Sequence, residues 1–300
     1  MSGRLEGGRL NGGRWLEVVA PGPFATVQDL GRPGRAALGV GRSGACDRAS
    51  SALANRLLGN HVGAAVLELV LGGLVLRAHG DVLVATAGAR CAGPFPHNAP
   101  TVLRDGAELA LGAPRAGLRT YLGVRGGIEV DPVLGSRSTD VLSGLGPPVV
   151  RAGDRLPVGV VGPVGAASGN VSGPPTVDVA PVPDPGAGEV AVLVLPGPRR
   201  SWFGDAGWAL LVGQVWQVTS DSDRVGLRLD GDPLQRLRAD ELPSEGLVRG
   251  AVQVPPSGRP VLFLADHPVT GGYPVLGYVA DADVDRCGQV RPGQALRLRG

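Results

Sequence analysis

The region between Ser220 and Pro274 contains the highest density of side chains able to do acid–base or ionic chemistry. These side chains are Asp221, Asp223, Arg224, Arg228, Glu245, Arg249, Gln253, Asp266, His267, Thr270 and Tyr273. The apolar run from Val261 to Leu264 predicts a buried strand, and Asp266 and His267 follow it directly. Functional groups often lie on loops at strand ends, so this carboxylate and imidazole are candidates for a site. A strand end capped by a satisfied aspartate explains the same pattern.

A carboxylate that ends a buried strand needs a strong donor, because burying it unpaired is costly. The sequence contains no lysine, so all 29 of its basic residues are arginines, whose planar guanidinium can bind a carboxylate at two points. Arg224 follows Asp223 at a predicted turn and precedes a predicted strand. We therefore predict that Asp266 and Arg224 share a pocket of the second half with Thr270 and Tyr273, and we take the pair as the candidate catalytic residues.

Two further segments, Gly135–Asp140 and Asp221–Arg224, combine arginine with hydroxyl or carboxylate side chains. Either segment could hold a carboxylate or a phosphate through arginine and hydroxyl donors. Either is also explained as a turn closed by an aspartate or serine side chain, with a solvated arginine.

The segment Gly39–Gly44 matches the GxGxxG pattern of dinucleotide-binding proteins and precedes a predicted helix. We reject a dinucleotide site, because the helix begins only after Asp47, whose carboxylate would repel a pyrophosphate, and no alternation of strands and helices follows. The pattern indicates a turn and a helix cap, with Ser43 and Asp47 free to face a ligand.

The composition excludes several classes of function. Without lysine the chain can have no Schiff-base lysine, no phosphate-loop lysine and no biotinyl-lysine. The formal net charge is +2 and the arginines alternate with acids, so no nucleic-acid face is expected. The four histidines have no spacing typical of a metal site, and we expect no metal.

The cysteines and the apolar runs of the sequence indicate in which cellular compartment the protein is expected. Cys46, Cys91 and Cys287 are an odd number, widely spaced, and suggest a reducing environment. Cys46 stands at a predicted helix start, where a thiol could be activated, although a small buried residue explains it more simply. No signal peptide or membrane span is recognised, so we expect a cytoplasmic protein.

The chain is predicted to be mainly β. Gly 50 and Pro 27 make up about a quarter of the 300 residues, but hydrophobic residues account for 43%, so we interpret the glycines and prolines as turns between short strands. The clearest helix begins after Asp47 as N-cap and stops at Gly59, and a shorter one is expected from Trp202 to Leu211. Asp105-Gly106 predicts a two-residue hairpin.

Four segments are expected along the chain. They are a flexible leader over 1–14, a β-rich half over 15–157, a linker or long loop over 158–188 and a second β-rich half over 189–300. A shared V-R-x-G-x-x-L pattern, beginning at Val150 and at Val290, suggests that the halves are related, although such a pattern is also a common turn. A barrel is the natural way for such strands to hide their edges.

In order, the chain's motifs resemble the carboxyltransferase-like family, which includes allophanate hydrolase subunit 2, the C-type subunit of 5-oxoprolinase and the second half of the urea carboxylase carboxyltransferase domain. The likeness runs from about Leu16 to Arg299. Its motifs are TVQDLGRPG, GVGRSGACDRASSALANRLLGN, LELVLGG, GSRSTD, SDSDRVGLRL, PSEGLVRGAVQVP and ADHPVTGGYPV.

This resemblance implies a cyclophilin-like β-barrel and a partner, the B-type or subunit 1 homologue of the same family. Members of the 5-oxoprolinase type act with that partner and an A-type subunit to open 5-oxoproline, a cyclic amide, to glutamate at the expense of ATP. Members within urea carboxylase transfer a carboxyl group from biotin to urea, and a third group antagonises an inhibitor of a sporulation kinase without catalysis.

We expect the first of these roles, because the chain stands without biotin-carboxylase or carrier segments. ATP would then be shared with partner subunits, and any biotin would be carried by a separate protein. Polar groups within the matching motifs, mostly at predicted strand ends, are the expected substrate-binding residues. They are Ser43, Asp47, Arg137, Ser138, Asp223, Glu245, Gln253, His267, Thr270 and Tyr273.

Overall fold

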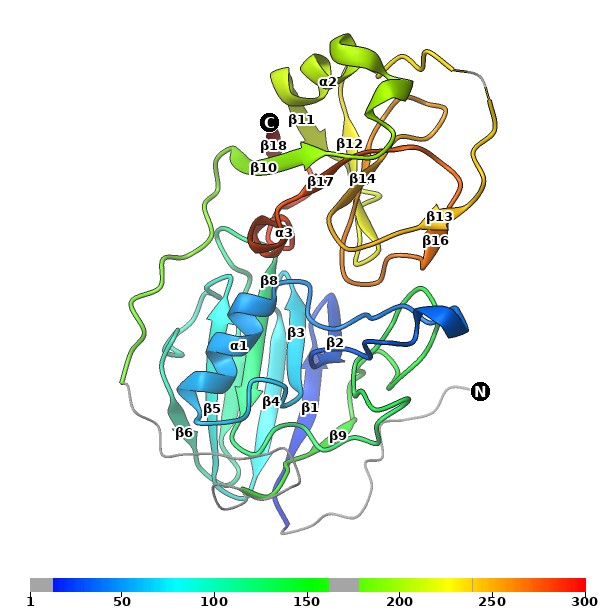
Figure 1. Cartoon of the computed structure of the whole chain (residues 1–300). Helices are drawn as coiled ribbons and strands as arrows, with labels where there is room; N and C mark the ends of the chain where they lie inside the picture. Colours follow the sequence, from blue (N-terminus) through cyan, green and yellow to red (C-terminus); the bar gives the residue numbers. More distant parts are fainter. Residues whose placement is uncertain (1–12, 162–177, 239) are drawn as a thin grey trace. The chain divides into compact units, whose positions relative to one another are not determined.

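The computed structural model describes residues 13–161, 178–238 and 240–300 (Figure 1). Residues 1–12 of the predicted leader and residues 162–177 of the predicted 158–188 segment lie outside these ranges. The described residues form mainly β-structure with three short α-helices, which confirms the predicted fold class. They divide into two units. Unit 1 is Met1–Arg32, Ser43–Asp140 and Gly144–Pro185, and unit 2 is Pro33–Arg42, Val141–Ser143 and Gly186–Gly300.

Unit 1 contains two antiparallel sheets and one helix. The first sheet has the order β7 (Glu108–Leu111), β4 (Leu74–His79), β1 (Trp15–Pro21) and β9 (Arg155–Pro157). The second has the order β2 (Phe24–Gln28), β3 (Val66–Val70), β8 (Arg119–Val124), β5 (Val82–Gly88) and β6 (Thr101–Leu103). Helix α1 (Arg48–Leu57) packs against β5 and β8.

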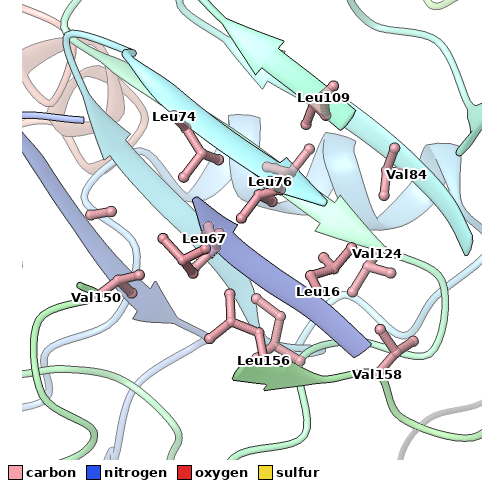
Figure 2. Packing of buried hydrophobic residues seen from close by; sticks show 14 of the residues in the cluster. Leu16, Leu67, Leu74, Leu76, Val84, Leu109, Val124, Val150, Leu156 and Val158 are labelled. Carbon is pink, nitrogen blue, oxygen red and sulfur yellow. The ribbon is translucent and has the colours of Figure 1, made fainter. Parts of the chain in front are cut away.

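The core of unit 1 lies between the apolar faces of these sheets. Figure 2 shows Leu16 of β1, Leu67 of β3 and Leu76 of β4 among the side chains that fill it. These three side chains are at most 1% exposed. Alternating burial along β4 shows that this strand presents one face to the core, as expected for a half-buried strand.

Unit 2 is built around a closed barrel, the architecture that the resemblance implied. Around the barrel the strands are β10 (Val190–Pro196), β17 (Val275–Val279), β14 (Ala251–Gln253), β15 (Val261–Phe263), β12 (Gly226–Asp230), β11 (Val215–Val218) and β18 (Ala295–Arg299). Strands β13 (Glu245–Gly246) and β16 (Thr270–Gly271) form a separate pair. The unit also contains helices α2 (Gly204–Gly213) and α3 (Asp281–Cys287) and two 3-10 turns, Ala36–Leu38 and Arg200–Trp202.

Both predicted helices are present. Helix α1 begins after Asp47, whose side chain accepts a hydrogen bond from the Ser50 N–H, and the chain leaves the helix through Gly59 at φ +64°. Helix α2 lies two residues further along the chain than predicted.

The predicted hairpin at Asp105-Gly106 is wrong. A turn is present, closed by the Ala107 N–H to the Arg104 carbonyl at 2.9 Å, but β6 pairs with β5 and β7 pairs with β4. The Asp105 carboxylate accepts from the Gly80 N–H at 2.7 Å and so ties this turn to the one after β4. The chain changes sheets at this corner instead of folding back on itself.

The V-R-x-G-x-x-L pattern forms the same turn in both units. In unit 1 the Gly153 N–H donates to the Val18 carbonyl at 2.7 Å, and the Val18 N–H donates to the Asp154 carbonyl at 2.9 Å. In unit 2 the Gly293 N–H donates to the Val218 carbonyl at 2.7 Å, and the Val218 N–H donates to the Gln294 carbonyl at 3.1 Å. The strands that follow, β9 and β18, pair antiparallel with β1 and β11 respectively. A common turn gives the same bonds, so the relation between the halves stays a prediction.

Candidate functional site

Three motif segments of unit 1 meet at the carboxylate of Asp29, which follows β2. Its Oδ1 accepts from the Ser136 hydroxyl at 2.6 Å, the Ser138 hydroxyl at 2.5 Å and the Gly31 N–H at 2.7 Å. Its Oδ2 accepts from the Arg137 N–H at 2.6 Å. The Asp29 backbone carbonyl accepts from the N–H of Ala45 at 3.1 Å, which adds the third segment. One half-buried carboxylate therefore fixes the loops around residues 28–32, 43–46 and 135–140, and we call this arrangement the Asp29 loop cluster.

The predicted residues Ser43, Arg137 and Ser138 all lie in the Asp29 loop cluster. Ser43 is buried at φ +56°, a left-handed conformation unusual for a residue other than glycine, and its hydroxyl donates to the Thr139 carbonyl at 3.3 Å. The Arg137 guanidinium donates to the Val130 carbonyl at 2.7 Å and forms an ion pair with Glu129. The sequence pattern predicted that the Ser43 side chain faces a ligand, whereas that side chain is engaged by the protein.

Asp47 belongs to a second buried hydrogen-bond network, at the start of α1. Its carboxylate accepts from both the N–H and the hydroxyl of Ser50, so it is engaged as a cap instead of facing a ligand as predicted. Its own N–H donates to the Tyr121 hydroxyl at 2.7 Å, and that hydroxyl donates to Glu68 at 2.8 Å. Arg119 lies 3.3 Å from the same Glu68 carboxylate.

The electrostatics of this network fix one protonation state. Burial, followed by the nearby Glu68 charge, raises the pKa of the Tyr121 phenol well above its usual value. Tyr121 therefore keeps its proton and remains a donor to Glu68. The apolar context of LELVLGG hid the fact that Glu68, 1% exposed, is the acceptor at the centre of this network.

In unit 2 the predicted pairing of Asp266 with Arg224 is confirmed. The Arg224 Nε donates to Asp266 Oδ2 at 2.9 Å, and its Nη2 donates to Oδ1 at 3.0 Å. The Val141 N–H also donates to Oδ2, at 3.0 Å. Both side chains are at most 2% exposed. The pair is thus fully engaged by the protein, and a substrate could meet it only after a local rearrangement.

The other candidates of unit 2 lie around the β13–β16 pair. Glu245 of β13 forms a two-point ion pair with Arg199. Gln253 of β14 is buried, and its Nε2 donates to the Tyr273 carbonyl at 2.9 Å. Thr270 of β16 is exposed, and Tyr273 is 45% exposed. The β13–β16 pairing sets Glu245 opposite Gly271 and Gly246 opposite Thr270.

Two candidates have local structural roles. The Asp223 carboxylate accepts from the N–H groups of Val225 at 2.8 Å and Gly226 at 3.2 Å, which is the aspartate-closed turn that the sequence pattern left open. The His267 Nδ1 lies 2.8 Å from the Pro268 carbonyl, and its ring is tilted against Phe263.

Sequence reasoning missed Asp29, Arg32 and Gln28, although all three lie in or next to the TVQDLGRPG motif. A buried polar residue on a strand has no distinctive spacing, and only the fold shows which loop it meets. Arg32 is 1% exposed and Gln28 is 0% exposed. The signal that could have found them was charge, since an aspartate and an arginine border a strand whose other residues are mostly apolar.

Within the described residues no three His, Cys, Asp or Glu side chains are grouped so as to hold a metal ion. In the same ranges no helix is long and apolar enough to cross a membrane. All three cysteines are free thiols, and Cys46 and Cys287 are buried.

A family model described as "Carboxyltransferase domain, subdomain A and B" matches residues 38–300. The C-type subunit of 5-oxoprolinase from Escherichia coli (strain K12) is 35% identical over 291 residues, which cover 94% of this chain and 90% of that protein.

Two solved structures are similar over almost the whole chain. The crystal structure of TTHA0988 matches with a TM-score of 0.83 and 35% identity, over 95% of this chain and 55% of that chain. The crystal structure of the K. lactis urea amidolyase matches with a TM-score of 0.85 and 29% identity, over 95% of this chain and 18% of that chain. This chain therefore spans about half of the first of these proteins and less than a fifth of the second.

Proposed function

Because this chain belongs to the carboxyltransferase family with subdomains A and B, we propose that it is the C-type subunit of a 5-oxoprolinase. In this role it acts with a B-type partner and an A-type subunit to hydrolyse 5-oxoproline to glutamate with ATP. The observation that carries the proposal is the match to the C-type subunit from Escherichia coli, which extends over 90% of that protein at 35% identity.

The same family module occurs inside longer chains, and this supports a partner. The chain covers only 55% of TTHA0988 and 18% of the urea amidolyase, so in those proteins the module is covalently joined to further sequence. In the proposed role as a C-type subunit, we infer that this chain associates with the B-type homologue.

The chain's own polar groups suit the binding of an amide better than the binding of a nucleotide. Phosphates would have to be held by arginine, hydroxyl and backbone N–H donors, because lysine is absent. The arginine of the Asp29 loop cluster that is partly exposed, Arg137, is already paired with Glu129. We therefore propose that ATP, which supplies the free energy of ring opening, is held mainly by the partner subunits.

The second candidate is the carboxyltransferase role in a urea carboxylase. It is favoured by the 29% identity to the K. lactis urea amidolyase over 95% of this chain. Biotin would then be attached to a separate carrier, since this chain has no lysine to bear it.

Reconstitution with both partner subunits tests the proposal. The complete assembly should release glutamate from 5-oxoproline in an ATP-dependent reaction, and omission of this chain should abolish it. Urea- and biotin-dependent ADP release would favour the second candidate instead. If neither substrate stimulates ATP hydrolysis while the partner still binds tightly, the chain has a binding role and the enzymatic proposal fails.

A further inference from the structure

Five buried side chains of unit 1 have a polar atom without a hydrogen-bond partner among the described residues, namely Gln28, Arg32, His97, Asn98 and Arg119. Two of them, Gln28 through Oε1 and Arg32 through Nη1, lie within the motif that contains Asp29. Gln28 is the last residue of β2 and Arg32 lies on the loop that follows it, and both side chains are at most 1% exposed. Buried polar groups are almost always paired, because an unmet hydrogen bond costs free energy. Two such atoms within one motif therefore indicate a site where something else completes the bonds.

The orientation of the Gln28 amide follows from its neighbours. Its Nε2 lies 2.9 Å from the backbone carbonyl of Thr139, which can only accept a hydrogen bond. The nitrogen therefore points at Thr139, and the unpaired atom is the carbonyl oxygen, an acceptor. The Arg32 guanidinium donates through Nη2 to the adjacent Ser138 carbonyl, and its unpaired Nη1 is a donor. The two side chains thus reach consecutive carbonyls and offer one free acceptor and one free donor.

The charges at this place favour a neutral ligand. Arg32 Nη1 lies 3.9 Å from Asp140 Oδ2, an ion pair without a hydrogen bond between these atoms. Asp140 is 3% exposed, so its charge is poorly screened and balances that of the guanidinium. An anion would be repelled by the Asp140 carboxylate and by the Gln28 oxygen. A neutral molecule that accepts one hydrogen bond and donates another would be repelled by neither group.

We propose that Gln28 and Arg32 form a binding site for a neutral amide group. The carbonyl oxygen of the ligand accepts from Arg32 Nη1, and its N–H donates to Gln28 Oε1. A lactam ring or urea carries these two groups on adjacent atoms. The inference deepens the proposed function, on which it rests for the identity of the amide, and it places amide recognition in unit 1.

A matched pair of ligands tests the site in the isolated full-length chain. 2-Pyrrolidinone has both the carbonyl and the N–H, whereas N-methyl-2-pyrrolidinone lacks the N–H. In ¹⁵N-labelled protein, 2-pyrrolidinone should shift the side-chain amide signal of Gln28. The N-methyl compound should bind about tenfold more weakly or worse, because it leaves the buried Gln28 oxygen unpaired. Equal binding of the two compounds, or an unchanged Gln28 signal, would overturn the proposal.

Variants provide the second measurement. Gln28→Met keeps the side-chain length but removes the amide, and it should abolish the preference for 2-pyrrolidinone over its N-methyl derivative. Gln214→Met is the control, because both amide atoms of Gln214 are already bonded to Asp232, and it should leave the preference unchanged. If Gln28→Met does not fold, the ligand pair on the unmodified chain still decides the question.

A buried water molecule is the competing occupant, because water also accepts and donates. A high-resolution crystal structure soaked in 2-pyrrolidinone distinguishes the two. Density for the lactam between Gln28 and Arg32 supports the site, and a water that the lactam does not displace refutes it. The proposed function fails separately: without glutamate release from the reconstituted assembly the subunit assignment falls, while the binding preference can stand.

Discussion

Asp266 and Arg224 show how a lysine-free chain stabilises a buried carboxylate. The side chain of Asp266 is 0% exposed, and its oxygens accept hydrogen bonds from the Arg224 guanidinium at two points and from the Val141 N–H. Such a pair is costly to break, because the partner left behind keeps its charge in a site without water. We retain Asp266 and Arg224 as the proposed catalytic pair. The same geometry also fits an ion pair whose role is to stabilise the fold.

Asp266→Asn separates these two roles. The substitution removes the charge of Asp266 from its buried ion pair with Arg224, so we expect the free energy of unfolding to fall by about 3 kcal/mol. If the pair serves the reaction, turnover per folded molecule of the reconstituted assembly should also fall by about 100-fold, the scale of losing a positioned acid–base group. Thermal denaturation and glutamate release measure the two effects. Unchanged turnover per folded molecule would remove Asp266 from the catalytic proposal and leave the fold and family unaffected.

His97 gives unit 1 a predicted pH dependence. Its ring is 9% exposed, with Nδ1 3.2 Å from the Thr86 hydroxyl and Nε2 3.7 Å from Asp184, and Arg90 also faces it. Burial lowers the pKa of His97 in the folded chain, with Asp184 opposing and Arg90 adding to the effect. The folded state therefore prefers the neutral ring. This preference stabilises the chain fully above the unfolded pKa of about 6.5 and is lost as the pH falls through the folded pKa.

The measurement is a difference between variants. Urea denaturation at pH 7.5 and 5.5 should show a larger loss of stability on acidification for the unmodified chain than for His97→Gln. His61→Gln is the control, because His61 is exposed. A His97→Gln chain with the same acid sensitivity as the unmodified chain would contradict the assignment.

The sequence was informative about residues whose chemistry demands a partner. The pairing of Asp266 with Arg224 could be predicted because a buried carboxylate requires a donor and Arg224 precedes a predicted strand. The role of Asp29 could not, because its four donors come from Gly31 and from the loop at residues 136–138, more than 100 positions away. No local pattern in a single sequence encodes such a pairing, although the motif containing Asp29 was itself recognisable.

At the scale of secondary-structure elements, the sequence predicted an element correctly where it contains both a start signal and a stop signal. Helix α1 has its N-cap at Asp47 and its exit at Gly59, and both were predicted. The turn at Asp105-Gly106 formed too, but its flanking strands joined different sheets, because turn residues specify a local bend and not the partner of each strand. Strand pairing depends on tertiary contacts, such as the bond from Gly80 to Asp105, that the sequence does not show.

The V-R-x-G-x-x-L turn occurs in both units, and its glycine allows us to predict the stability cost of an alanine substitution in each. Gly153 has φ +84° and Gly293 has φ +79°, and each donates to a valine carbonyl at 2.7 Å. An alanine at Gly293 would meet open space, so its cost is conformational, about 1–2 kcal/mol for a left-handed residue. We expect Gly153→Ala to cost a similar amount, because the turn is the same.

Urea denaturation of the single variants measures both costs. Gly186→Ala is the control, since that glycine also has open space around it but no left-handed φ, and it should leave the stability nearly unchanged. Costs at Gly153 and Gly293 that differ by more than about 1 kcal/mol would show that the two turns are under different constraints.

At the scale of the whole chain, the fold class could be predicted from composition and spacing. A barrel was expected because many short strands must hide their edges, and the family resemblance implied one as well. Short apolar runs separated by glycine and proline indicate many strands without saying how they close. In unit 2 the closure depends on β10, which pairs in parallel with β18 and antiparallel with β17. These contacts join strands about 100 and 80 positions apart, beyond the range of turn and periodicity signals.

Exposed apolar side chains of unit 2 bear on how the chain assembles. Several large apolar side chains of unit 2 remain exposed, including Leu193 at 46% and Leu195 at 51% on β10 and Val248 at 54%. Single exposed apolar residues are ordinary, but this chain also matches only part of two longer proteins, in which further sequence accompanies the module. We therefore expect the chain expressed alone to self-associate or to be poorly soluble, and co-expression with the B-type homologue to give a stable complex.

Size-exclusion chromatography at micromolar concentration measures both outcomes. The variants Leu193→Ser and Leu195→Ser report whether β10 contributes to the association. A chain that stays monomeric and does not co-purify with that partner would contradict the hetero-oligomer proposal, whatever its activity.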